Sequence, residues 1–493
     1  MSDADRVWVG LDLGTQSARA VAVSGDGSVA GSASRPLAGR RDGERHEQEP
    51  QAWWDAVCAA CNEALEGVDQ AHVAGVATCA TSGTVLLVDD DGDPLTPGLM
   101  YDDARAAEHA AAAEAAGRAL GHRIGAGWGL PKLLWLLEHE PALARGARLA
   151  HQPDVVTCRL VGREVACDSS HALKSGFDVE RETWPHELLD GLGVPARLLP
   201  QVVRSGSRLG AVCQPAAAKT GLPAGTPVVA GMTDSCAAQL AAGALREGAW
   251  NSVMGTTLAL KGVAAQRIVD PNGVLYCHRA PDGGWLPGGA SSSGAGVLSE
   301  RFGDRDLDDL GRRAQDHEAG APLAYPLAGR GERFPFQATD AHGFVLGEPA
   351  GEAEHFAALL QGLAYVERLC LDYVSLLGAP VDGELSLTGG GTRSRYWCQL
   401  RADVLGRPVR LPEQTESAFG MAVLAAASTL GRAPADVAAA MCRTREVVEP
   451  RRDRAGRFDE PYLRLVDELE RRGWLQGELA AHARARASGA AHG

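Results

Sequence analysis

The chain has 493 residues, of which 45% are hydrophobic and 23% are charged, and its formal net charge is −15. This length exceeds what one hydrophobic core normally serves, so we expect two domains of a few hundred residues each. The acidic balance argues against nucleic-acid binding, which needs a clustered Lys/Arg surface, and no apolar run approaches the length of a membrane span. The polar N-terminus leads straight into a strand, so we expect no signal peptide and a cytoplasmic location.

The first predicted element is a β-hairpin at residues 7–23. A β-rich run, Val-Trp-Val-Gly-Leu-Asp-Leu, meets Gly14-Thr15, and a second apolar run follows. This pattern is typical of two antiparallel strands joined by a tight turn. The turn offers unpaired backbone N–H groups and a hydroxyl, which together can form a small anion-binding concavity.

The rest of the first half alternates strands and helices, which predicts a mixed sheet with helices packed on it. Within the helix that contains Trp53, Cys58 and Cys61 form a close pair of thiols. A zinc site would need a second pair nearby, so we interpret both as buried small hydrophobes in a reduced compartment. The expected strands lie near residues 28–34, 73–77, 85–88 and 228–231, and the expected helices near Trp53, 104–120 and 130–138.

The second half opens with another hairpin signal at residues 250–260, in which a β-rich run meets Gly255-Thr256. A strand over 384–388 then runs into three glycines, helical sequence resumes over 418–430, and the chain from about residue 480 is predicted to be disordered. The repeated hairpin indicates a duplicated fold, actin-like and ribonuclease-H-like, with a nucleotide in the cleft between the copies. No Gly-Lys-Ser/Thr loop is present, so paired hairpins would hold the phosphates instead of a P-loop.

Asp234 is the sharpest candidate for chemistry. It follows the apolar strand at 228–231 where the chain turns from strand to helix. One interpretation is a helix N-cap, a position that Asp favours. The other is a general base, because an acid beside bound ATP could accept the proton of an attacking hydroxyl.

Two further segments carry candidate ligands, each with a structural alternative. Asp12 precedes the first Gly-Thr turn and is either a turn residue or a ligand of Mg²⁺, which prefers carboxylate and phosphate oxygens. The glycines at 389–391 lead into a helix that contains Trp397. They are either a C-cap or crossover turn with Trp397 in the core, or a place where a base or ribose approaches the backbone closely and Trp397 covers the purine.

Taken together, the chain resembles the FGGY carbohydrate kinases over essentially its whole length. The resemblance rests on Leu-Asp-Leu-Gly-Thr at 11–15, Lys-Leu-Leu-Trp-Leu at 132–136, Gly-Met-Thr-Asp at 231–234, Met-Gly-Thr-Thr at 254–257, the three glycines with Trp397, and Glu-Ser-Ala-Phe-Gly-Met-Ala at 416–422. Gly129 departs from the first family signature, and residues 343–362 match the second one only loosely.

The resemblance implies an α/β, two-domain actin-like (ASKHA) fold that phosphorylates a sugar or polyol with ATP and Mg²⁺. It implies a sugar-binding N-terminal domain at 1–243, an ATP-binding domain at 244–435, and C-terminal helices with a tail at 436–493. Asp234 falls on the family's catalytic base. The implied sugar contacts are Asp12, Ser82 and Asp234, the implied metal ligands are Asp12 and Asp234, and the implied ATP contacts are Gly14, Thr15, Gln16, Gly255, Thr256, Gly390, Gly391, Ser394 and Trp397.

The substrate is predicted from the segment after the strand near 73–77. Many xylulose kinases carry Gln-Met-His-Gly there, whereas this chain has Ala-Thr-Ser-Gly-Thr at 80–84. This segment and those at 171–174, 288–294 and 330–335 are similar to the D-ribulose kinase branch. D-ribulose is therefore the first expectation and D-xylulose the second, with other ketoses or polyols behind them.

One different class of protein stays open, a non-catalytic actin-like ATP-binding sugar sensor. An actin-like chaperone would need a peptide-binding domain after the ATPase, and too little chain follows residue 420 for one. We expect a monomer or homodimer whose only partners are the sugar and ATP, with no nucleic acid and no membrane.

Overall fold

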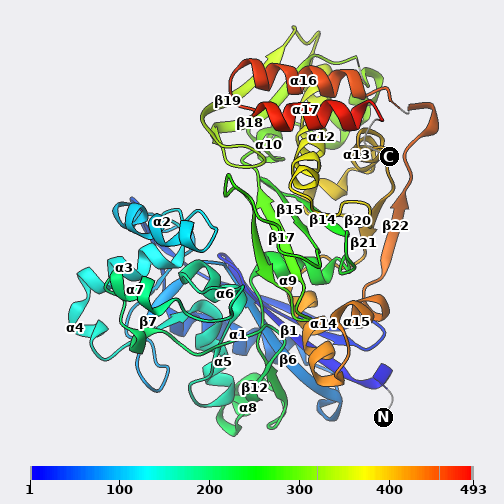
Figure 1. Ribbon diagram of the computed structural model, residues 1–493. Coiled ribbons are helices and arrows are strands. Elements are labelled where there is room, and N and C mark those ends of the chain that lie inside the picture. Colours follow the sequence, from blue (N-terminus) through cyan, green and yellow to red (C-terminus); the bar gives the residue numbers. More distant parts are fainter. Residues whose placement is uncertain (1–2, 319, 455, 490–493) are drawn as a thin grey trace. The chain divides into compact units, whose positions relative to one another are not determined.

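The computed structural model describes residues 3–318, 320–454 and 456–489 (Figure 1). It divides into two compact units. The first contains residues 1–243, 278–285 and 414–443, and the second contains 244–277, 286–413 and 444–493. Residues 414–435 thus group with the first unit and 444–493 with the second, a different division from the domain ranges expected from sequence.

A six-stranded sheet in the order β12-β13-β6-β1-β2-β3 forms the centre of the first unit. β1 pairs antiparallel with β2 and parallel with β6, which itself pairs parallel with β13. The strands of this sheet are β1 (Val7–Leu13), β2 (Ser17–Ser24), β3 (Val29–Pro36), β6 (Val73–Ala80), β12 (Arg208–Ala211) and β13 (Pro227–Val229). The first predicted hairpin is therefore confirmed.

A second sheet of the first unit has the order β4-β5-β8-β7-β9. It contains β7, which the sequence pattern placed in the central sheet. β7 follows the loop after β6, and its residues 85–88 pair with β9 instead of with a strand of the central sheet. Its strands are β4 (Arg40–Asp42), β5 (Arg45–Gln48), β7 (Val85–Val88), β8 (Gly98–Leu99) and β9 (Arg148–His151), and a separate pair is formed by β10 (Cys167–Asp168) and β11 (Val202–Val203).

Helices cover the sheets of the first unit, and its apolar core includes Trp53, Trp54 and Val57 of α1 with strand residues of β1 and β6. Cys61 of this helix is fully buried and Cys58 is partly buried; both are free thiols. The helices are α1 (Pro50–Ala64), α2 (Ala110–Ala119), α3 (Gly129–His139), α4 (Pro141–Ala144), α5 (Gln152–Val161), α6 (Ser169–Ala172), α7 (His186–Gly191), α8 (Gln214–Thr220), α9 (Asp234–Ala241), α14 (Ser417–Leu430) and α15 (Pro434–Met441).

Glycines let α14 pack directly against the backbone of its neighbours in the first unit. A Cβ added at Gly10 of β1 would lie 1.7 Å from the carbonyl oxygen of Ala418, and one at Gly420 would lie 2.0 Å from that of Ala237 in α9. Only a residue without a side chain allows this approach. The contacts explain why a segment so late in the sequence belongs to the first unit.

The second unit repeats the local topology of the first. Its sheet has the order β16-β17-β15-β14-β20-β21-β22, in which β14 pairs antiparallel with β15 and parallel with β20. This matches the pairing of β1 with β2 and β6, so the second hairpin and the predicted duplication are confirmed. The strands are β14 (Trp250–Met254), β15 (Leu258–Gly262), β16 (Tyr276–Arg279), β17 (Trp285–Ala290), β20 (Leu385–Thr388), β21 (Val409–Pro412) and β22 (Thr444–Val448).

Helices and a separate two-stranded sheet complete the second unit. They are α10 (Gly296–Phe302), α11 (Leu307–Ala314), β18 (Leu323–Glu332), β19 (Ala338–Leu346), α12 (Glu352–Leu376), α13 (Arg395–Leu405), α16 (Asp459–Arg471) and α17 (Gly477–Ala487). Over residues 480–487 the prediction of disorder is wrong, because α17 buries Leu479, Ala480 and Ala483 and runs beside α16 (Figure 1). Residues 490–493 lie outside the described residues.

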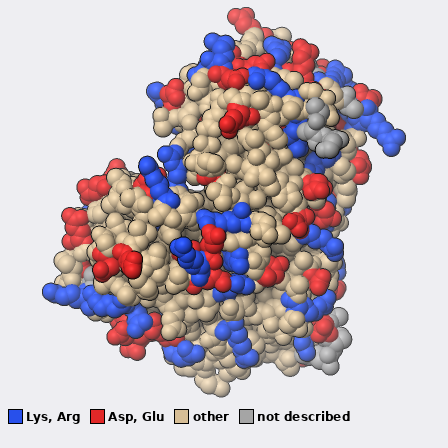
Figure 2. Space-filling view, viewed as in Figure 1, with Lys and Arg blue, Asp and Glu red and all other residues tan. Residues whose placement is uncertain are grey.

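None of the helices among the described residues is both long and apolar enough to cross a membrane. Acidic and basic side chains are interspersed over the face shown in Figure 2.

Candidate active site

The tip of the first hairpin is held from two sides. The backbone N–H of Gly14 donates to the carbonyl oxygen of Ser17 (3.0 Å), which closes the turn. The Gln48 side-chain amide donates to the carbonyl oxygen of Thr15 (2.7 Å) and accepts from the indole N–H of Trp53 (2.7 Å). The exposed turn residue Gln16 and the partly buried Thr15 are therefore presented on a fixed backbone.

Two carboxylates of the first unit interact next to this turn. Burial of Asp12, followed by the negative charge of Asp234, raises the pKa of the Asp12 carboxyl to about 6. A hydrogen bond from the Cys79 thiol (3.4 Å) and the charge of Arg19 act in the opposite direction. Two like charges in a partly buried place each make the other harder to ionise.

The backbone positions Asp234 at the first turn of α9. Thr233 is the N-cap and Asp234 is the first helical residue, so the N-cap interpretation of Asp234 does not hold. The N–H of Thr233 donates to Ser170 Oγ (3.0 Å), and the hydroxyl of Ser417 donates to the carbonyl oxygen of Asp234 (3.1 Å). Hydrogen bonds from two other segments therefore fix the backbone that carries the Asp234 side chain.

The donor set of this pair suits a hard divalent cation. Mg²⁺ is bound through one or two carboxylates together with substrate phosphates. Asp12 and Asp234 supply such oxygens, and a cation would remove the repulsion that raises the pKa of Asp12. The residues therefore fit the metal that the sequence predicts.

The loop after β6 carries the small hydroxyl residues. The backbone N–H and hydroxyl of Thr81 both donate to Gln152 Oε1, at 3.3 and 2.8 Å, and the Thr81 and Thr84 hydroxyls are 2.6 Å apart. A bridge between Ala80 and Thr233 places this loop beside the start of α9. The Ser82 Oγ is buried and has no hydrogen-bond partner among the described residues.

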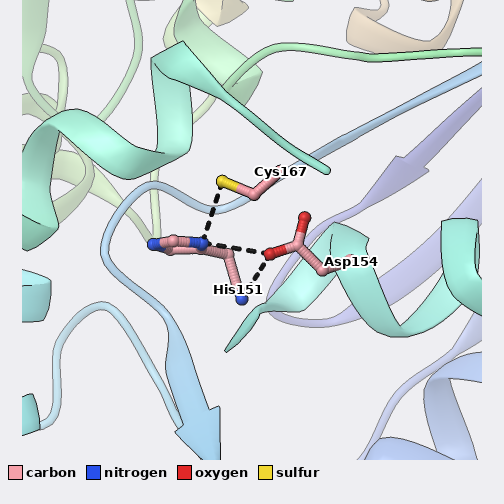
Figure 3. Close-up of side chains that lie close together, drawn as sticks. All are labelled: His151, Asp154 and Cys167. Atoms are coloured by element: carbon pink, nitrogen blue, oxygen red, sulfur yellow. Dashed lines mark hydrogen bonds and ion pairs between the residues drawn. The ribbon is translucent and has the colours of Figure 1, made fainter. Parts of the chain in front are cut away.

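His151, Asp154 and Cys167 form a buried cluster at the start of α5, the helix that Gln152 begins (Figure 3). Asp154 Oδ2 accepts from the backbone N–H of His151 (2.7 Å) and lies 3.1 Å from His151 Nδ1, while Cys167 Sγ lies 3.4 Å from the same nitrogen. The donor atoms of these three residues lie within 4.8 Å of one another, the spacing of a metal site. Because the same contacts form the helix cap, we assign the cluster a structural role.

Lys132 of α3 ties three loops of the first unit together. Its ammonium donates to the carbonyl oxygens of Gly83 (2.9 Å), Met100 and Gly127 (3.2 Å). The side chain is fully buried, and burial lowers the pKa of the amine to about 7. One cation thus fixes the far end of the loop that contains Ser82.

In the second unit, the second hairpin borders a cavity of about 650 Å³. The N–H of Gly255 donates to the carbonyl oxygen of Thr257 (3.1 Å) and closes the turn as Gly14 does in the first hairpin. The cavity is lined by the turn, the start of α10, part of α11 and the Gly-rich segment, including Gly255, Thr256, Gly296, Gly390, Gly391, Ser394 and Trp397.

The Gly-rich segment forms one wall of this cavity. Gly389 has φ of +82°, which only glycine adopts easily, and a Cβ on Gly391 would lie 2.9 Å from the Trp397 ring. A Cβ on Gly390 would meet nothing within 4 Å. The Ser394 hydroxyl caps α13 by accepting from the N–H of Trp397 (3.2 Å). The Trp397 ring is buried, as the core interpretation expects, and it also lines the cavity; its contact with a purine stays a prediction.

Two family models match the chain in order. The model of the N-terminal domain of the FGGY family of carbohydrate kinases matches residues 7–241, and the model of its C-terminal domain matches residues 250–429. The chain belongs to the FGGY family of carbohydrate kinases. It is therefore an ATP-dependent sugar kinase. The predicted two-domain actin-like fold is confirmed.

The relatives of this FGGY kinase include pentulose kinases. A xylulose kinase from Streptomyces rubiginosus is 30% identical over 442 residues, which cover 87% of this chain and 89% of that protein. The structure of a xylulose kinase from Rhodospirillum rubrum aligns with a TM-score of 0.85 at 28% identity, covering 94% of this chain and 99% of that one. A glycerol kinase from Plasmodium falciparum with ADP (TM-score 0.83, 17% identity, 94% and 98% covered) shares the fold.

The structure of this FGGY kinase groups the predicted residues in two sets. Asp12, Thr15, Ser82 and Asp234 belong to the first unit, and the Gly255-Thr256 turn with the glycines and Trp397 belongs to the second. Their roles stay predictions. Sequence reasoning missed the supporting residues Gln48 and Gln152, because each acts on a turn 33 or 71 residues earlier and no local pattern marks such a partner.

Proposed function

We propose that this FGGY kinase transfers the γ-phosphoryl group of ATP to a hydroxyl of a ketopentose, with D-ribulose as the substrate and D-ribulose 5-phosphate as the product. The observation that carries the sugar assignment is the buried hydroxyl of Ser82, which has no partner within the described part of the chain and lies on the loop beside the start of α9. An unsatisfied buried polar group is costly, so a ligand hydroxyl is its natural partner. Gln152 Nε2 and Ser169 Oγ are further buried atoms of the first unit without a partner among the described residues.

The loop also has the right size for this assignment. Thr81 and Ser82 are small where many xylulose kinases have the large Met and His side chains, and Thr81 already uses its hydroxyl on Gln152. That leaves Ser82 as the loop hydroxyl available to a substrate. A site built to bond a substrate hydroxyl discriminates strongly against a sugar that does not present it.

In the proposed reaction Asp234 accepts the proton of the attacking sugar hydroxyl. The sugar oxygen forms a bond to the γ-phosphorus while the bond between that phosphorus and the β–γ bridging oxygen breaks, and ADP leaves. When bound at Asp12 and Asp234, Mg²⁺ supplies charge neutralisation for the phosphate oxygens. The Thr15 and Thr256 turns offer N–H groups and hydroxyls to the phosphates.

The cavity of the second unit is proposed to bind the nucleoside part of ATP. Its volume of about 650 Å³ lies in the range of small-molecule sites. The open space over Gly390 leaves room for a ribose or base to contact the backbone. Transfer requires the γ-phosphorus of this ATP to come within bonding distance of the sugar hydroxyl whose proton Asp234 accepts.

D-xylulose is the second candidate substrate, because two of the relatives named above are xylulose kinases, at 30% and 28% identity. A coupled assay of ADP release over a panel of ketoses and polyols tests the proposal. We expect the highest kcat/KM with D-ribulose. A higher value with D-xylulose would replace the substrate, and no turnover with any sugar would favour the non-catalytic sensor.

A further inference from the structure

Glu332, the last residue of β18, is a buried carboxylate that accepts five hydrogen bonds. Its Oε2 accepts from the hydroxyls of Ser291 (3.0 Å), Ser293 (3.1 Å) and Tyr325 (2.7 Å). Its Oε1 accepts from the backbone N–H groups of Ser292 (2.6 Å) and Arg333 (2.9 Å). A carboxylate has about four lone-pair positions, so this one is saturated by its donors.

Three of the five donors belong to one short turn after β17, residues 291–293, which we call the serine turn. Within the turn, the N–H of Ser293 donates to the hydroxyl oxygen of Ser291 (2.9 Å). Ser291 and Ser293 are both fully buried, and Glu332 is 3% exposed. Hydrogen bonds to a charged acceptor are stronger than neutral ones, so Glu332 is the group that fixes the shape of the turn.

The serine turn in turn holds the second hairpin. The N–H of Leu258 donates to the carbonyl oxygen of Ser293 (2.7 Å), and the N–H of Ser291 donates to that of Leu258 (2.8 Å). Immediately after the serine turn, the backbone N–H of Ala295 donates to the carbonyl oxygen of Gly255 (2.8 Å). The N–H of Gly296 donates to the carbonyl oxygen of Thr256 (3.0 Å). The hairpin tip and the start of α10 therefore share one backbone frame, and both line the cavity.

The chain after the serine turn packs closely against the second hairpin. A Cβ added at Gly294 would lie 2.3 Å from Thr257 Cα, so the chain after the serine turn presses directly on the hairpin. A displacement of the turn must therefore move the residues that offer N–H groups to a ligand. Preorganised donors of this kind contribute to binding and catalysis only when a supporting shell holds them in place.

We propose that Glu332 is a positioning residue for nucleotide phosphates, which sets the Gly255–Thr256 turn through the serine turn without touching the ligand. The inference rests on the proposed nucleotide site of the second unit. It adds that the phosphate-binding geometry of this hairpin is set by a carboxylate 76 residues farther along the chain, which has no contact with the cavity itself.

Three variants test the inference, with KM for ATP, KM for the sugar and ADP affinity by calorimetry as readouts. Glu332→Gln keeps the size of the side chain but replaces one acceptor oxygen by an NH₂ group, which would face donors and leave them without an acceptor. We expect KM for ATP and the Kd for ADP to rise about ten- to a hundredfold. The KM for the sugar should change little, since the predicted sugar residues lie in the first unit. Ser291→Ala, a milder change at the turn, should give the same split.

A matched control is Asp372→Asn in the same unit. Asp372 is also buried and also accepts from a tyrosine, Tyr462 (2.5 Å), but the partners given for it, Tyr462 and Arg486, lie outside the serine turn. The control should lower the melting temperature while leaving KM for ATP unchanged. If Glu332→Gln and Ser291→Ala alter both KM values equally, or neither, the positioning role is wrong.

Gly390→Val separates this failure from failure of the site itself. Its side chain enters open cavity space, so ADP affinity should fall without loss of stability. Weaker ADP binding in Gly390→Val with normal binding in Glu332→Gln would overturn only the role of Glu332. Normal ADP binding in Gly390→Val would overturn the nucleotide site on which the inference rests.

Discussion

Asp12 at the end of β1 and Asp234 at the start of α9 are electrostatically coupled, since the charge of Asp234 is, after burial, the main cause that raises the pKa of Asp12. Their segments lie more than 200 residues apart in sequence. The coupling places the two predicted acids of the reaction in one location of the first unit. A change at one of them should therefore affect chemistry more than folding.

Asp234→Asn should lower kcat by about 10²–10⁴-fold, because removal of a general base typically has this effect. The substitution keeps the shape of the side chain, and most of the ATP affinity should be retained because the cavity proposed for the nucleoside part lies in the second unit and Asp12 remains to hold Mg²⁺. Steady-state kinetics with a thermal melt as the folding check measures both. A kcat close to that of the wild type would remove Asp234 from the role of base.

Ser82→Ala should reduce kcat/KM for D-ribulose by about ten- to a hundredfold, since a lost hydrogen bond leaves a substrate hydroxyl unsatisfied at a cost of about 1–3 kcal/mol. KM for ATP should change little. Ser205→Ala is the matched control, because Ser205 Oγ is likewise buried without a partner among the described residues but lies on the loop between β11 and β12. Equal losses for all sugars in Ser82→Ala would contradict the assignment to D-ribulose.

Lys132 should make the free energy of unfolding depend on pH between about pH 7 and 10.5. Burial lowers the pKa of its amine in the folded protein to about 7, while the unfolded chain keeps the ordinary value of 10.5. Between these values the unfolded state binds more protons, so stability rises with pH, by at most about 1.4 kcal/mol per pH unit. The full contribution is present above pH 10.5 and is lost as the pH falls through 7.

Urea unfolding of wild type and Lys132→Met at pH 7, 8 and 9 measures this slope. The variant should show a flatter dependence, whereas Lys219→Met, at an exposed position, should keep the wild-type slope. The charged groups around Lys132 are Asp102, Asp103, Arg105 and Lys174, and they are the same in both proteins. Parallel curves for wild type and Lys132→Met would show that the amine does not titrate in this range.

Gly420→Ala should destabilise the protein by about 1–3 kcal/mol or more, because the new Cβ would lie 2.0 Å from the backbone oxygen of Ala237 and α14 would have to move away from α9. Gly191→Ala is the control, since it is also helical and its Cβ would meet nothing within 4 Å. The control should be neutral or stabilising by up to about 1 kcal/mol. Thermal and urea unfolding compare the two, and equal effects would show that helix propensity, not close packing, governs position 420.

Local sequence was enough to predict both hairpins, the Gly-rich turn and the candidate acids. A hairpin joins neighbouring residues, so its signal lies within about a dozen positions. Asp12 lies near the end of a strand and Asp234 shortly after one, and the apolar runs of both strands are visible in the chain. The repeated hairpin predicted the duplicated fold, and the resemblance of several short motifs to the FGGY kinases predicted the family. Local sequence also predicted disorder from about residue 480, which is wrong over residues 480–487 because the apolar residues of α17 become a helix face only against the helices they pack on.

Tertiary structure alone decided which distant segments support the site. No local sequence pattern marks Gln48, Gln152 or Glu332 as a partner of a distant turn. Their partners Thr15, Thr81 and Ser292 lie 33, 71 and 40 residues earlier, respectively. The place of α14 in the first unit likewise follows from two glycines that allow backbone contact across more than 180 residues. Sequence patterns encode what a residue prefers locally, whereas a buried polar group is satisfied by whichever donor or acceptor the folded chain brings to it, and that choice exists only once the chain has packed.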